Sequence, residues 1–274
     1  MKPVGARVTG LRVDALDEAT VTDVRRLLAE HGVLVLPGQY ADDTAFLRFL
    51  RSFGPIMFTV GETPVPEHPD LNVVSNLGRS GPGKRAPRST FHTDTSYVRR
   101  PPAFTALRAV TVPDRGGHTM FTNQYAAYAT LPDDVRQQLN GREITHVMTG
   151  LQLSPDAETS ATHPVFGVHP ISGRTYLYLS TPERCVHVSG MSPEHAAETV
   201  EFLFAHSTRA DNVYRHTWSP GDVVIWDNRC VLHKADHSGV LGDRVMHRGM
   251  VADESRGTNQ MGSRLSASGL TLEE

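Results

Sequence analysis

The sequence predicts a mainly β fold with flanking helices, built as an antiparallel barrel or sandwich. From about residue 104 onward, many short apolar or alternating runs are separated by turn signals such as Ser172-Gly173 and Pro220-Gly221. Short strands at such spacing are typical of antiparallel β architecture. Two amphipathic helical patterns precede these runs and a third interrupts them, so helices should cover the sheets. The 274 residues suit a single domain of this kind, residues 1–274.

The N-terminal part predicts a helix, a strand and a second helix. The first helix covers about Thr22–His31 and stops at Gly32, while the second covers about Asp42–Phe53 and stops at Gly54-Pro55. Between them the apolar run Val33–Leu36 indicates a short buried strand.

The strand candidates alternate or are continuously apolar over five to nine residues, as expected when one or both faces are buried. Within this series, Ser192 and Pro193 begin a helix that should end near Ser207, because serine caps helix N-termini and proline fits the first turn. The strand candidates are Phe104–Val112, His118–Thr122, Ile144–Met148, Pro164–Val168, Arg174–Leu179, Asp222–Trp226 and Arg244–Val251.

Composition excludes several classes of function. The net charge is −3 and the pI is near 6.5, which argues against a nucleic-acid partner. No run approaches the length of a membrane span, and the N-terminus lacks the apolar run of a secretory signal. Two cysteines form no disulfide framework, so a reduced cytoplasmic setting is expected. Whether the chain forms a homo-oligomer is left open.

Two segments have compositions that cannot pack well. Residues 78–89 (GRSGPGKRAPRS) hold three glycines, two prolines and four cations, which predicts a mobile loop over about residues 78–90. This loop lies directly before the strongest motif of the chain and could act as a lid over an anionic substrate. A flexible C-terminal tail is expected over about residues 254–274.

The tripeptide His92-Thr93-Asp94 is a candidate metal motif. On an extended segment the first and third side chains lie on the same face, so an imidazole and a carboxylate can bind one metal ion together. A distant second imidazole would complete a facial triad of two histidines and one carboxylate. Such a triad leaves coordination positions open for a cosubstrate and O2 on Fe(II).

The segment from Trp218 to Met250 supplies the missing partners. It contains a Pro-Gly turn, a buried strand ending in Trp226-Asp227-Asn228-Arg229, and then His233, Arg244 and Arg248. A buried arginine requires an anionic partner, and the distal carboxylate of 2-oxoglutarate would fit it in a bidentate manner.

Together these pieces resemble the taurine dioxygenase (TauD/TfdA) family of Fe(II)/2-oxoglutarate oxygenases. The resemblance spans about residues 30–252, in the order of the family and near its spacing. It implies a double-stranded β-helix (jelly roll) with packed helices. The matching segments are His92-Thr93-Asp94, Gly116-Gly117-His118-Thr119, His163-Pro164-Val165 to His169-Pro170, Phe202–His206, Trp226–Arg229, His233, Arg244 and Arg248.

The resemblance implies roles for individual residues. His92, Asp94 and His233 would be the iron ligands, and Thr119 with Arg244 would hold the distal carboxylate of 2-oxoglutarate. Arg248 matches an arginine that faces the anionic end of the substrate in members acting on sulfonates or carboxylates.

The sequence departs from the family pattern near the expected substrate pocket. Thr59 and Glu62 stand where taurine enzymes carry a histidine and a tyrosine, and Arg88 replaces an asparagine before the first iron ligand. The usual Gly-Gly-Asp-Thr is Gly-Gly-His-Thr, with His118 expected to point away from the iron. Taurine is therefore expected to be a poor substrate. Glu62 and Arg88 suit a zwitterionic molecule, or they pair with each other.

The predicted activity is oxidation, most simply hydroxylation, of a small anionic or zwitterionic molecule. Fe(II) would be the cofactor, 2-oxoglutarate and O2 would be the cosubstrates, and succinate and CO2 would be released. Desaturation or cyclisation by the same chemistry remains an alternative. A zinc hydrolase built on the same three ligands, or a non-catalytic binding module, would leave Thr119 and Arg244 without a role.

Overall fold

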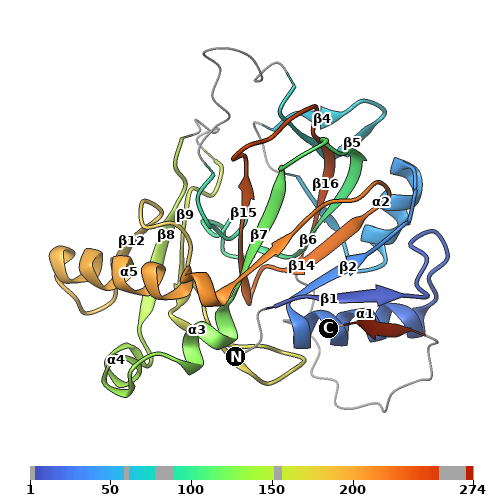
Figure 1. The fold of residues 1–274 in the computed structure, drawn as a ribbon. Helices are drawn as coiled ribbons and strands as arrows, with labels where there is room; N and C mark the ends of the chain where they lie inside the picture. The colour runs from blue at the N-terminus through green and yellow to red at the C-terminus, as the bar shows by residue number, and fades with distance from the viewer. Residues whose placement is uncertain (1–3, 59–61, 78–88, 151–155, 253–269, 274) are drawn as a thin grey trace.

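A computed structural model describes residues 4–58, 62–77, 89–150, 156–252 and 270–273. Two antiparallel sheets face each other and form the centre of the molecule (Figure 1). The larger sheet has nine strands among the described residues. Eight of them are hydrogen-bonded in the order β17-β1-β2-β14-β6-β16-β5-β4, and β3 pairs with β16. Within this described sheet, β1 and β2 form the one parallel pair. Their bounds are β1 Ala6–Thr9, β2 Val33–Leu36, β3 Ile56–Met57, β4 Pro64–Val65, β5 His68–Ser75, β6 Pro102–Thr111, β14 Val223–Asp227, β16 Val245–Ala252 and β17 Thr271–Glu273.

The smaller sheet has the order β13-β7-β15, formed by Val213–His216, His118–Asn123 and Val231–Asp236. One apolar cluster fills the space between the two sheets, and it includes Phe121, Val224 and Trp226. The neighbouring residues Val223 and Ile225 belong to a second cluster on the outer face of the larger sheet. Strand side chains alternate between faces, so a continuously apolar strand such as β14 is buried on both sides.

Two helices cover the outer face of the larger sheet. They are α1 (Glu18–His31) and α2 (Asp43–Arg51), and each has an aspartate cap whose carboxylate accepts a backbone N–H of the first turn. Leu28 of α1 and Phe46 of α2 are fully buried in the outer cluster. The predicted mainly β architecture with flanking helices is therefore confirmed.

A third layer lies beside the smaller sheet, where α5 packs next to β12 (Figure 1). It has its own apolar cluster, to which Leu177, Val188 and Leu203 belong. Its elements are α3 Gln124–Ala129, α4 Asp133–Leu139, β8 Glu143–Val147, β9 Ser160–Pro164, β10 Phe166–Val168, β11 Thr175–Leu177, β12 Cys185–Val188, α5 Pro193–Ser207 and the 3₁₀ turn Ala210–Asn212.

Some predicted boundaries are wrong for local reasons. The first helix begins at Glu18 rather than Thr22, because Asp17 caps it. The run Pro164–Val168 is not one strand: β9 ends at Pro164, and β10 pairs with β11 in a different sheet. Thr271–Glu273, within the predicted tail, pairs with β1 as β17. Residues 253–269 and most of the predicted loop, residues 78–88, lie outside the described residues.

Strand β16 and helix α2 approach each other unusually closely. A Cβ built on Gly249 would overlap Leu50 Cδ1 of α2 and lie 3.0 Å from Leu71 Cδ2 of β5. Only glycine therefore allows this strand to lie at its present depth beneath the helix.

Candidate active site

Two imidazoles and a carboxylate meet at one end of the space between the sheets. Asp94 Oδ1 lies 3.7 Å from Nε2 of His92 and 3.7 Å from Nε2 of His233. The two imidazole rings have centroids 4.4 Å apart. One ligand atom from each residue falls within 4.8 Å of the others, the only such metal-capable grouping found in the described part of the chain. Two imidazole nitrogens and one carboxylate oxygen are a donor set that suits Fe(II), and they leave further coordination positions of the metal open.

Backbone pairing brings these distant residues together. His233 lies on β15, and its N–H and C=O exchange hydrogen bonds with His92 at 2.9 and 3.0 Å. The Nδ1 of His92 contacts Thr90 O at 2.8 Å, which leaves Nε2 facing the centre. The segment His92-Thr93-Asp94 was predicted to be extended, but it forms only this one β-bridge at His92. The chain turns at Asp94, and Val98 N–H donates to Thr95 O within that turn.

Asp94 is oriented by a buried hydrogen-bond chain that the sequence did not reveal. Asn228 Nδ2 donates to Thr105 Oγ1 at 2.8 Å, so the hydroxyl proton of Thr105 is directed to Asp94 Oδ2 at 2.7 Å. Trp226 Nε1 in turn donates to Asn228 Oδ1 at 3.1 Å. One carboxylate oxygen is thus occupied, and the other faces the two imidazoles.

The protonation preferences of these groups favour a metal site. Burial lowers the pKa of His233 to about 3 and also lowers the pKa of His92, so both imidazoles prefer the neutral form that binds metals. Burial alone would raise the pKa of Asp94, but the neighbouring His233, Arg248 and His92, together with the Thr105 hydroxyl, outweigh it and hold that pKa well below its usual range.

A guanidinium lies buried near this centre without a carboxylate partner among the described residues. Arg244, which is 2% exposed, precedes β16 and donates from Nε to Gly117 O at 2.8 Å and from Nη2 to Thr119 Oγ1 at 3.3 Å. Burial lowers the pKa of Arg244 to about 10. Thr119 Oγ1 also accepts from Trp218 Nε1 at 3.0 Å, so its own proton is free to donate. This arrangement presents donors to an anion.

Steric contacts explain why a glycine stands at position 117, two residues before Thr119. Gly117 has a φ of +69°, and a Cβ there would lie 2.8 Å from Pro113 Cγ and 3.0 Å from Arg244 Cδ. The aliphatic part of the arginine therefore lies directly over the glycine backbone. In the same motif, the half-buried His118 faces away from Thr119 because the two residues are consecutive on β7.

Arg248 of β16 lines the same cavity as Arg244, which stands just before the strand. Its Nη1 is 3.7 Å from Asp94 Oδ1, and its Nη2 forms an ion pair with Glu62 Oε1. Burial alone would lower the pKa of Arg248, but Asp94 and Glu62 raise it. Glu62 therefore pairs with Arg248. The proposed partner of Glu62, Arg88, and the predicted pocket residue Thr59 lie outside the described residues.

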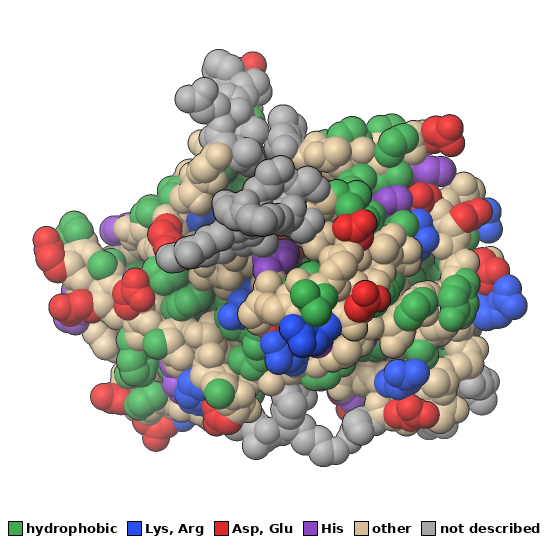
Figure 2. All heavy atoms as spheres, turned by 45° about the horizontal axis from the view of Figure 1, so that its top comes forward, with side chains coloured by type: hydrophobic (Ala, Val, Ile, Leu, Met, Phe, Trp, Pro, Cys, Tyr) green, Lys and Arg blue, Asp and Glu red, His purple; other side chains and the backbone are tan. Residues whose placement is uncertain are grey.

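One cavity of about 910 Å³ is lined by the two imidazoles, Thr119, Arg244, Arg248 and Glu62. His, Lys and Arg side chains gather near the middle of the face in Figure 2, beside the residues drawn in grey. Besides the predicted residues, the cavity is lined by Asn72 of β5 and by Arg184, whose Nε is 3.4 Å from Thr149 Oγ1. Sequence reasoning missed both residues. An asparagine inside the apolar run of β5 was the available signal for Asn72.

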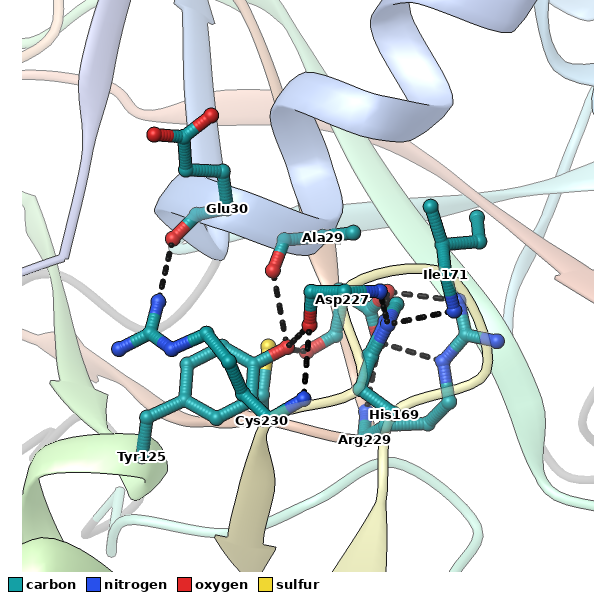
Figure 3. Close-up of polar contacts among 10 residues, drawn as sticks. Ala29, Glu30, Tyr125, His169, Ile171, Asp227, Arg229 and Cys230 are labelled. Atoms are coloured by element: carbon teal, nitrogen blue, oxygen red, sulfur yellow. Dashed lines mark hydrogen bonds and ion pairs between the residues drawn. The ribbon is translucent and has the colours of Figure 1, made fainter. Parts of the chain in front are cut away.

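A second buried network secures the turn after β14 (Figure 3). Asp227 accepts from Arg229 at 2.6 and 2.8 Å and from His169 Nε2 at 3.0 Å. His169 Nδ1 accepts from the N–H groups of Ile171 and Ser172, which places the ring proton on Nε2. Burial would raise the pKa of Asp227, but Arg229 and His169 hold it well below its usual range. The network fixes the turn from which Asn228 reaches Thr105.

Among the described residues, no helix combines the length and apolar character needed to cross a membrane. The model of the "Taurine catabolism dioxygenase TauD, TfdA family" matches residues 1–250. An alpha-ketoglutarate-dependent 2,4-dichlorophenoxyacetate dioxygenase from Cupriavidus pinatubonensis is 30% identical over 265 residues, covering 88% of this chain and 92% of the relative.

A pentalenolactone F synthase from Streptomyces arenae is 32% identical over 275 residues, covering 90% of this chain and 91% of the relative. The crystal structure of AAD-2 in complex with Mn(II) and N-oxalylglycine superimposes with a TM-score of 0.79 at 26% identity, covering 92% of this chain and 96% of that one.

The fold and the family match define an oxidoreductase of the α-ketoglutarate-dependent dioxygenase class, where α-ketoglutarate is 2-oxoglutarate. The chain belongs to the TauD/TfdA family. The predicted jelly roll and the predicted family are both confirmed.

Proposed function

We propose that the protein uses Fe(II), 2-oxoglutarate and O2 to hydroxylate a small anionic or zwitterionic molecule, releasing succinate and CO2. His92, Asp94 and His233 hold the Fe(II). Bound Fe(II) supplies the chemistry that couples oxidative decarboxylation of 2-oxoglutarate to oxidation of a substrate C–H bond. One atom of O2 enters succinate and the other enters the hydroxylated product, so the reaction balances.

The observation that best supports this proposal is the environment of Arg244. Its guanidinium is buried, has no carboxylate partner among the described residues, and lies in the same cavity as the two imidazoles of the metal-capable triad. A buried cation of this kind is costly unless an anion completes it. We assign the distal carboxylate of 2-oxoglutarate to Arg244 and to the free hydroxyl proton of Thr119. A zinc hydrolase using the same triad would leave both donors without a purpose.

We assign an anionic group of the substrate to Arg248, whose Nη1 lies 3.7 Å from Asp94 Oδ1. A carboxylate there would lie beside the metal, so the carbon next to it would be within reach of oxidation. The 2,4-dichlorophenoxyacetate enzyme, a relative of this chain, acts on a molecule with such a carboxylate.

The first experiment measures metal and cosubstrate use. Single variants His92→Ala, Asp94→Ala and His233→Ala should lose Fe(II) binding in anaerobic calorimetry and lose succinate formation, while circular dichroism shows an intact fold. Fe(II) affinity equal to wild type in any of them would remove that residue from the ligand set. Hydrolysis supported by Zn(II), without any 2-oxoglutarate consumption, would favour the hydrolase.

The second experiment tests the anion at Arg248. Small carboxylic acids are compared with their methyl esters in wild type and in Arg248→Ala, reading substrate-stimulated succinate. The acid should be preferred by wild type, and the variant should lose that preference. Product analysis by mass spectrometry separates hydroxylation from desaturation or cyclisation, for which the relationship to a pentalenolactone F synthase gives a reason to look.

A further inference from the structure

Three polar side chains, Glu62, Asn72 and Arg248, form one wall of the cavity, and the last two are partners in strand register. Asn72 on β5 is the Cα partner of Arg248 on β16, and it is also the partner of Pro64 on β4. Directly opposite residues in antiparallel strands project to the same face, so Asn72 and Arg248 point into the cavity together. Glu62, two residues before Pro64, reaches the same place and pairs with Arg248.

This wall contains unsatisfied hydrogen-bonding atoms. Asn72 is 1% exposed, yet within the described part of the chain neither its Oδ1 nor its Nδ2 has a hydrogen-bond partner. The same is true of Glu62 Oε2 and Arg248 Nε. Buried polar groups are hydrogen-bonded as a rule, so atoms left open at the edge of a binding cavity indicate a ligand that completes them. Two of the four atoms, Glu62 Oε2 and Asn72 Oδ1, require donors, and the other two require an acceptor.

The local charges determine which donor fits. Arg248 already faces two carboxylates, Glu62 and Asp94. When Fe(II) is bound, the metal offsets the charge of Asp94, but a substrate carboxylate at Arg248 would still be a second negative group beside Glu62. A positive charge beside Glu62 would offset this repulsion, whereas a neutral hydroxyl would satisfy the hydrogen bonds without offsetting the charge.

We infer that the substrate is an amino acid or a close derivative with a free ammonium group next to its carboxylate. The ammonium donates to Glu62 Oε2 and Asn72 Oδ1, while the carboxylate accepts from Arg248 Nε and Asn72 Nδ2. One primary amide can serve both groups, because its oxygen and nitrogen project side by side. This inference rests on the proposed function and specifies the substrate class for the same site.

The test compares matched compounds in the Fe(II) enzyme. The common L-amino acids are each compared, at equal concentration, with the deamino acid and the α-hydroxy acid of the same side chain. Two readouts are recorded: succinate formed above the substrate-free background, and the anaerobic change in the visible absorption of the Fe(II)·2-oxoglutarate complex. The best amino acid should exceed its deamino analogue by about tenfold or more in kcat/KM, as expected for loss of a charged hydrogen bond.

Two variants assign the effect to this wall. Glu62→Gln keeps the shape of the side chain and removes its charge, so the preference for the ammonium compound should shrink to about threefold or less. Asn72→Leu should weaken binding of the amino acid in the absorption titration. Glu67→Gln, an exposed residue of the β4–β5 turn, is the matched control and should behave as wild type.

The outcomes separate the inference from the proposed function. Failure of the protein to bind 2-oxoglutarate with Fe(II) would defeat the proposed function itself. If that complex forms, the inference is overturned by equal use of deamino acids, by a preference for hydroxy acids, by no response to any amino acid, or by an unchanged preference in Glu62→Gln. In those cases water completes Glu62 and Asn72.

Discussion

The hydroxyl of Thr105 donates to Asp94 Oδ2 at 2.7 Å and cannot turn away, because its oxygen is occupied by Asn228 Nδ2 at 2.8 Å. Carboxylate ligands held in this way bind a metal through the remaining oxygen with little reorganisation. The contact therefore links a strand of the larger sheet, β6, to the proposed iron centre.

Replacing Thr105 by valine should weaken Fe(II) binding by about tenfold or more, the usual effect of removing a partner of a metal ligand. Valine fills the same volume, so the fold should persist. Anaerobic calorimetry with Fe(II) measures the affinity, and Thr111→Val on the exposed end of the same strand is the control. An unchanged Fe(II) affinity in Thr105→Val would mean that Asp94 is positioned by other contacts.

Removing the guanidinium of Arg244 should raise the Kd for 2-oxoglutarate by at least about tenfold, because a charge-assisted bidentate pair is worth roughly 1.5–3 kcal/mol. Thr119→Val should cost about 0.5–1.5 kcal/mol, the value of one neutral hydrogen bond. Anaerobic titration of the Fe(II) protein with 2-oxoglutarate measures both changes. Arg215→Ala, a variant of an exposed residue on β13, serves as control. Equal affinity in wild type and Arg244→Ala would place the cosubstrate elsewhere.

A methyl group at Gly117 should push Arg244 away from the site. Gly117→Ala meets Pro113 and the arginine stem in addition to the strain of a positive φ, so it should weaken 2-oxoglutarate binding as well as stability. Gly141→Ala is a close control, since Gly141 has a φ of +74° and nothing within 4 Å of the added Cβ. It should share the loss of stability, about 1 kcal/mol or more, and leave the cosubstrate Kd unchanged. Similar Kd values in the two variants would contradict the steric link.

Asp227→Asn should lower the free energy of unfolding by about 3–5 kcal/mol, because it removes the buried carboxylate that accepts hydrogen bonds from Arg229 and His169. The folded-state pKa of Asp227 is lower than that of an unfolded aspartate, near 3.9. Its stabilisation is therefore complete above about pH 4 and is lost as the pH falls below that value. Denaturant unfolding of wild type and variant at pH 7 and at successively lower pH measures the difference.

The control for this variant is an exposed pair with the same spacing. Arg209 and Asp211 form a surface ion pair, with 35% and 75% of the two side chains exposed. Asp211→Asn should cost less than about 1 kcal/mol because solvent screens the charges. A loss of stability in Asp227→Asn that does not diminish in acid would show that shape, rather than charge, makes the network stable.

The sequence allowed the triad to be predicted because its residues follow a motif, and motifs record positions along the chain. It allowed β2 to be predicted with the observed bounds because four consecutive apolar residues must be buried on both faces. Asn72 and Thr105 could not be found in this way. Their roles depend on contacts between segments more than 100 residues apart. A threonine within a strand signals no site, and the asparagine in β5 marks an unusual position without showing what its side chain faces.

The turn at Asp94 shows the same limit at shorter range. Alternation along a strand predicts that His92 and Asp94 share a face, and they do meet at one centre. The backbone reaches this arrangement through a bridge and a turn instead, with Thr93 Oγ1 donating to Leu179 O on the opposite side. Local periodicity was therefore a correct guide to the side chains and a wrong guide to the backbone.

The contact between Gly249 and Leu50 gives the outer helix an influence on the cavity. Leu50 packs directly against β16 at Gly249, the residue next to Arg248, so we expect the bulk of this helical side chain to affect how far the guanidinium projects inward. A smaller or larger residue at position 50 is expected to move the proposed anion-binding group without altering any residue that lines the cavity. Natural variation in this helix is thus a route by which relatives with identical pocket residues could diverge in the molecules they accept.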